Sequence, residues 1–160
     1  MIEHKNVKDY LEIAGILSVI ATLLFLAFEL RQANQIAKSQ IAVEVSGSYA
    51  EISDLVYTND AVAALRVKAQ DPGFNPSEVE QEKLRAIARR YIGVSIMIEN
   101  AYNNGHQSRG QLEGSFATIE ILLKDMPGLR TAFAMELEDR PGWIEGFESM
   151  RHLNGVVARP

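Results

Sequence analysis

The sequence contains no cysteine. This absence excludes disulfide bonds, thiolate zinc sites, iron–sulfur clusters and cysteine nucleophiles. It does not identify a compartment, because a protein without thiols can lie on either side of a membrane. Positive charge is also scarce, since 16 lysines and arginines stand against 21 aspartates and glutamates and the formal net charge is −5. We therefore expect no nucleic-acid-binding surface.

Motifs that carry chemistry are missing as well. The chain has no glycine-rich phosphate loop, no nucleophile elbow and no kinase signature. His4, His106 and His152 lie in three separate segments, and Glu148 with His152 supplies only two of the ligands that a metal site needs. We therefore expect no catalytic residue, no metal ion and no cofactor, and we predict that the protein is not an enzyme.

Apolar residues, in contrast, are concentrated near the N-terminus. Residues 13–28 read IAGILSVIATLLFLAF and carry no charge. Extension to residues 11–30 places Glu12 and Glu29 one position inside the two ends. A bilayer core about 30 Å thick needs about 20 helical residues, and carboxylates so near the ends can reach the headgroups. We predict a transmembrane helix over residues 11–30, with a buried helix of a soluble bundle as the alternative.

A signal peptide is a second alternative for this segment. Lys5 and Lys8 suit the basic start of a signal peptide, but Asp9 and Glu12 directly precede the apolar run. No cleavage site of the A-x-A kind follows the run, so we expect the segment to be retained. Basic residues are almost equally frequent on its two sides. We place the C-terminal part in the cytoplasm because nothing indicates export.

The predicted span has two different sides. At 100° per residue, Ser18 and Thr22 lie within about 20° of Glu29, and Gly15 lies within about 40°. The opposite side carries bulky aliphatic residues, namely Ile13, Ile16, Leu17, Ile20, Leu23 and Leu24. Small and hydroxylated residues let a second helix approach closely. We therefore predict a helix-association face of Gly15, Ser18, Thr22 and Glu29; the alternative is that the hydroxyls bond only their own backbone.

The rest of the chain has the periodicity of helices and no strand alternation. Between residues 29 and 58 only Gly47 disfavours a helix, and a stripe recurs at spacings of three and four: Ile41, Val45, Ser48, Ile52 and Leu55. We predict one long helix that leaves the membrane and continues as the first helix of a small antiparallel bundle. The expected organisation is a short tail over 1–10, the span over 11–30, a stalk and first bundle helix over 31–58, and the remaining helices over 59–155. The fold class is all-α without a sheet.

Turn and capping residues divide the remaining bundle into helices. Asn59-Asp60 opens a short helix over 61–70, and Asn75-Pro76 opens a longer one that stops at residues 103–105 (NNG). Three further helices are expected over 112–126, 129–138 and 143–153.

Charged residues on these helices suggest structural roles. Glu99 lies late in the long helix, opposite an apolar face, and we expect its carboxylate to cap or brace the next helix. The other carboxylates are expected on solvated faces: Glu78, Glu80, Glu82, Glu136, Glu138 and Asp139. The basic cluster is expected on an exposed face as well, with contact to anionic lipid headgroups as the alternative: Lys83, Arg85, Arg89 and Arg90.

Four segments resemble a group of uncharacterised bacterial membrane proteins that have one N-terminal span and a C-terminal helical domain of about this size. They are residues 29–34 (ELRQAN), 98–102 (IENAY), 126–130 (MPGLR) and 143–147 (WIEGF). The resemblance implies this topology and a location in the bacterial inner membrane. It implies no mechanism, because the group has no established activity.

The features together favour a non-enzymatic, single-pass membrane protein that acts by helix association. Its partners would be the lipid bilayer and other membrane helices, either copies of itself or the subunits of a larger complex. A small homo-oligomeric ion channel with Glu29 near the pore mouth is the first alternative. The second is a membrane-anchored ligand-sensing domain with a pocket around Tyr91, Tyr102 and Phe116.

Overall fold

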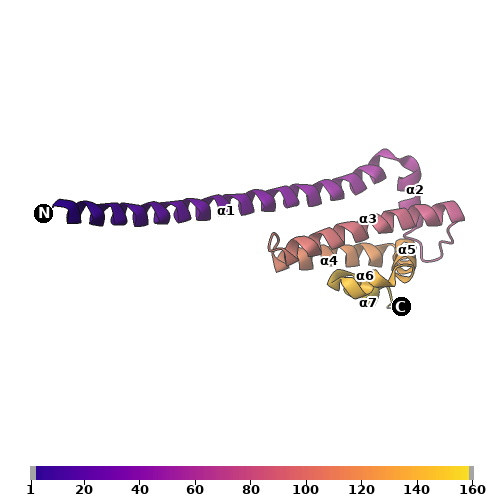
Figure 1. Cartoon of the computed structure of the whole chain (residues 1–160). Helices are drawn as coiled ribbons and strands as arrows, with labels where there is room; N and C mark the ends of the chain where they lie inside the picture. The colour runs from indigo at the N-terminus through magenta and orange to yellow at the C-terminus, as the bar shows by residue number, and fades with distance from the viewer. Residues whose placement is uncertain (1–2, 159–160) are drawn as a thin grey trace. The chain divides into compact units, whose positions relative to one another are not determined.

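The structure is a computed structural model that describes residues 3–158 and, within this range, all side chains except those of residues 3–6, 56 and 57. Over this range the chain forms seven helices and no strand (Figure 1), which confirms the all-α prediction. The helices are α1 (Glu3–Thr58), α2 (Asp60–Lys68), α3 (Glu78–Asn103), α4 (Arg109–Asp125), α5 (Pro127–Glu138), α6 (Pro141–Gly146) and α7 (Glu148–Val157). Two compact units divide the chain, one ending at Gln40 and one beginning at Ile41.

Helix α1 continues without interruption through Gly47 and ends at Thr58. It begins at Glu3, so residues 3–10 are its first turns rather than a separate tail; residues 1 and 2 and the side chains of His4 and Lys5 lie outside the described set. In the part of α1 that belongs to the C-terminal unit, Ile52 is buried. The other four residues of the predicted stripe are half-buried: Ile41, Val45, Ser48 and Leu55. The stripe is therefore the face that packs on the bundle.

Most helix ends follow local capping signals. Asn59 has an extended backbone, and its side chain accepts hydrogen bonds from the backbone N–H groups of Ala61 and Val62, which confirms the predicted start of α2. Helix α3 ends at Asn103, and Gly105 adopts a positive φ of 72°, a conformation that favours glycine.

The predicted start of α3 was wrong by two residues. Ser77, not Asn75, is the N-cap, because its hydroxyl accepts from the backbone N–H of Glu80 while the carboxylate of Glu80 accepts from the backbone N–H of Ser77 at 3.0 Å. This reciprocal pair satisfies two N–H groups at once. Asn75 and Pro76 therefore remain in the preceding loop.

The C-terminal segment also differs from the prediction of one helix over 143–153. It forms two helices, α6 and α7, separated by Phe147, whose backbone is extended at φ −129° and ψ 134°. Phe147 is the N-cap residue of α7, and its side chain makes no capping hydrogen bond.

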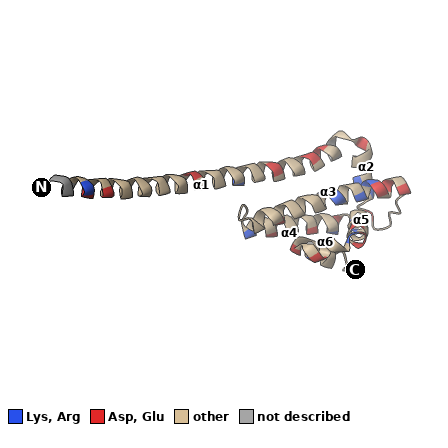
Figure 2. Ribbon diagram, viewed as in Figure 1, with Lys and Arg blue, Asp and Glu red and all other residues tan. Residues whose placement is uncertain are grey.

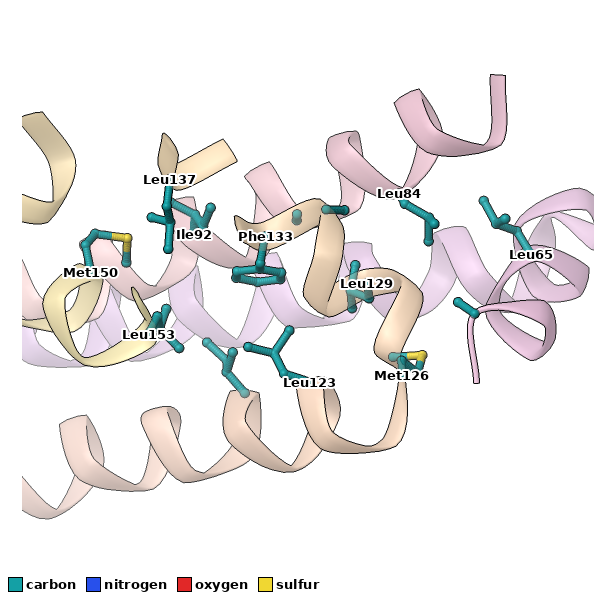
Figure 3. Close-up of a cluster of buried hydrophobic side chains, with 14 residues drawn as sticks. Leu65, Leu84, Ile92, Leu123, Met126, Leu129, Phe133, Leu137, Met150 and Leu153 are labelled. Carbon is teal, nitrogen blue, oxygen red and sulfur yellow. The ribbon is translucent and has the colours of Figure 1, made fainter. Parts of the chain in front are cut away.

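The main core lies where α3, α4, α5 and α7 pack against one another. Phe133 lies in the middle of this core, with Met150 and Leu153 toward one end and Leu65 and Leu84 toward the other (Figure 3). A second, smaller cluster joins α1 to α3 and α4 through buried side chains: Ile52, Val94, Ile98, Leu112 and Phe116. Both clusters belong to the C-terminal unit.

Candidate functional site

The first candidate site is the apolar surface of α1 in the N-terminal unit. Every side chain over residues 7–30 is exposed, and the large apolar ones are 48–73% accessible. Figure 2 shows a long stretch of α1 without a charged residue, and in the sequence this stretch lies between Glu12 and Glu29. By length and composition this helix suits a membrane span, and a signal sequence near the N-terminus has the same properties.

The predicted association face lies on this surface, and its hydroxyls already have partners. The Ser18 hydroxyl donates to the carbonyl oxygen of Ala14 at 2.8 Å, and the Thr22 hydroxyl donates to the carbonyl oxygen of Ser18 at 2.8 Å. A Cβ atom at Gly15 would meet nothing within 4 Å. Each hydroxyl oxygen can still accept a bond from another helix, so this self-bonding is compatible with association but does not require it.

The face is less uniform than the predicted set suggests. At 100° per residue, Phe25 lies within about 40° of Glu29, and its side chain is 61% exposed. Glu29 is exposed as well. A helix that docks here would meet the small residues Gly15 and Ser18, and then the ring of Phe25 and the carboxylate of Glu29 near the end of the apolar run.

Glu99 acts as a cap, as predicted, although on a different helix. Its side chain, 5% exposed, accepts from the backbone N–H of Glu148 and from that of Ser149, each at 2.8 Å. These N–H groups belong to the first turn of α7, not to α4, which follows α3 in sequence. The carboxylate therefore replaces the side-chain cap that Phe147 does not provide, and its negative charge favours the N-terminal end of the helix.

Glu136 contradicts the predicted solvated face. Its side chain is 0% exposed, and it accepts from Arg85 Nε at 2.6 Å, from Arg89 at 3.4 Å and from Arg140. Arg85 also pairs with Asp139. These ion pairs join α3 to α5, so we assign them a structural role.

The basic cluster on α3 is divided by this arrangement. Arg85 and Arg89 are engaged between α3 and α5, whereas Lys83 and Arg90 are exposed. The sequence contained one indication that Arg85 and Arg89 would bind the same partner, because they are four residues apart and so lie on one helix face.

The three aromatic residues that the sequence placed around a ligand pocket pack around the second core cluster instead. Phe116 is buried there, and Tyr91 and Tyr102 pack against it. Tyr91 does line a pocket, which has a volume of about 160 Å³. Phe116 and Tyr102 do not line it.

The histidine near the C-terminus has a partner other than Glu148. A ring nitrogen of His152 lies 2.7 Å from a carboxylate oxygen of Glu120, and its ring stacks on Phe116 with the centroids 5.2 Å apart. Among the described residues, no group of three or more potential ligands is placed to hold a metal ion.

In comparisons with protein-family models, curated proteins and solved structures, no match to this chain was found. The resemblance to a bacterial membrane family therefore stays a prediction, carried by the four sequence segments alone.

Proposed function

We propose that this protein is a single-pass membrane protein of a bacterial inner membrane that acts without catalysis, through association of its N-terminal helix. It serves as a homo-oligomer or as an accessory subunit of a larger membrane complex. The C-terminal helical unit lies on the cytoplasmic side.

The observation that supports this proposal is that every side chain over residues 7–30 is exposed, with the large apolar ones 48–73% accessible. Burial of one large apolar side chain is worth about 1.5–3 kcal/mol. Five such side chains would therefore contribute about 10 kcal/mol, which is on the order of the whole stability of a domain. A surface of this kind is covered by lipid or by another apolar helix.

The two sides of α1 suit two different neighbours. Ile16, Ile20 and Leu24 present bulky aliphatic groups, which suit lipid chains. The open space at Gly15 and the small side chain of Ser18 suit a second helix, because TM helices associate through close backbone packing rather than through a hydrophobic force.

Membrane insertion is tested first, on the full chain. We expect the protein to stay with membranes after an alkaline wash, to be released by detergent, and to keep its N-terminal segment by intact mass. A monodisperse soluble protein without detergent would refute the membrane role. A mass that lacks the N-terminal segment would instead identify a cleaved signal sequence.

Association is tested with single cysteines, since the natural chain has none to interfere. In membranes, Ser18→Cys and Thr22→Cys should form oxidative cross-links to a second copy or to a partner subunit. Ile20→Cys, on the opposite side, is the matched control and should not. Equal cross-linking of all three, or of none, would contradict the association face.

The same approach gives the orientation. Ser39 is exposed just after the apolar run. With a membrane-impermeant maleimide, Ser39→Cys should be labelled in inverted vesicles and protected in intact cells; the reverse pattern would place the C-terminal unit outside.

A further inference from the structure

The C-terminal unit holds a pocket that membrane anchoring does not explain. It has a volume of about 160 Å³ and is lined by five helical segments and their connections. Its walls include Ile52, Leu84, Met126 and Leu129, none more than 6% exposed. Figure 3 shows the last three of these near the α2 end of the main core. For comparison, an apolar cavity of about 150 Å³ accommodates a molecule the size of benzene.

The rim of the pocket is polar. Arg66 and Ser53 line it and are exposed, while Tyr91 is half-buried. None of the ion pairs found among the described residues involves Arg66. Burial raises the pKa of the Tyr91 hydroxyl, and the positive charge of Arg66 acts on it in the opposite direction. The hydroxyl is therefore protonated at neutral pH, able to donate a hydrogen bond, and close enough to Arg66 to sense its charge.

We propose that this pocket binds a small monocarboxylate, with an apolar part of about six carbon atoms in the pocket and its carboxylate held by Arg66 and the Tyr91 hydroxyl. The planar guanidinium matches a carboxylate through two parallel hydrogen bonds. We favour a monocarboxylate over a phosphate monoester, which carries nearly two negative charges, because Arg66 is the one cationic side chain among the described lining residues. The site does not depend on the membrane role, so either proposal can fail without the other.

Methionine methyl groups provide the test. The chain has five methionines; Met126 lines the pocket, whereas Met150 is also buried in the same core but does not line it. We would label the methyl groups with ¹³C in the full chain, in lipid nanodiscs or, should the chain prove soluble, in buffer alone, and titrate with hexanoate. The Met126 resonance should shift and saturate, and the Met150 resonance should stay in place.

Charge recognition is tested with hexan-1-ol and with variants. Arg66→Gln should weaken hexanoate binding by about fivefold or more while leaving hexan-1-ol binding unchanged, since one charge-assisted pair at a partly exposed site is worth that much. Arg90→Gln, an exposed arginine outside the pocket, is the matched control. Ile87→Phe, which adds volume to the lining, should abolish the response to both molecules with the Met150 resonance intact.

Two results would overturn the proposal. One is the absence of a saturable Met126 shift with hexanoate. The other is binding of hexan-1-ol as tightly as hexanoate with no effect of Arg66→Gln, which would reduce the pocket to an apolar void.

Discussion

Substitution of Glu99, whose carboxylate caps α7, is the most direct test of how the C-terminal unit is held together. Glu99→Gln keeps the shape of the side chain but replaces one oxygen by an NH₂ group. One of the two backbone N–H groups, that of Glu148 or that of Ser149, then faces a donor instead of an acceptor, and the negative charge at the start of α7 disappears.

The contacts set the expected magnitude. A hydrogen bond to a charged group contributes about 1.5–3 kcal/mol, and a carboxylate at a helix N-terminus adds about 0.3–1 kcal/mol. Glu148 is exposed, so water can replace part of its lost bond, whereas Ser149 is 0% exposed and cannot be hydrated in this way. We therefore expect Glu99→Gln to lower the free energy of unfolding by about 2 kcal/mol, or the Tm by about 6–12 °C for a domain of this size.

Trp143 provides the signal, because it is the only tryptophan and packs half-buried against the main core beside α7. We would follow its fluorescence during urea unfolding of the full chain in nanodiscs. Glu145→Gln, at an exposed carboxylate nearby, is the control and should change stability by less than about 0.5 kcal/mol. If Glu99→Gln also stayed within that limit, the carboxylate would not be a stabilising cap.

Two further predictions concern carboxylates. Glu136→Gln should cost about 2 kcal/mol, below the 3–5 kcal/mol of a fully buried pair because its arginine partners are 20–37% exposed; the exposed Glu138→Gln is the control, and equal urea midpoints would refute the assignment. Hydrogen bonds from Lys68 and from the Ser77 N-cap lower the pKa of Glu80 from 4.5 to about 2. The ionised form is thus favoured in the folded state, and its stabilisation is complete above pH 4.5 and is lost as the pH falls toward 2. Urea midpoints between pH 5 and 2 should therefore fall less for Glu80→Gln than for the natural chain, and parallel curves would contradict this.

Several structural features were predictable because they depend on near neighbours in sequence. Asn59 and Gly105 mark helix ends through their own backbone and side-chain properties, and both predictions hold. The start of α3 needed a choice between two local caps, and the Ser77–Glu80 pair outweighs Asn75 because it satisfies two N–H groups.

Periodicity and composition over a few turns were enough to predict the helical fold, the apolar run over residues 11–30 and the stripe that ends at Leu55, whereas the exposure of that run comes from the structure. Tertiary structure alone decided the break at Phe147, the burial of Glu136 and the pocket beside Tyr91. Glu99 and Ser149 are 50 residues apart, and Arg85 and Glu136 are 51 apart. At such separations local propensity carries no information. Only the packing of α3 against α5 and α7 determines which polar groups are removed from water and must therefore pair with one another.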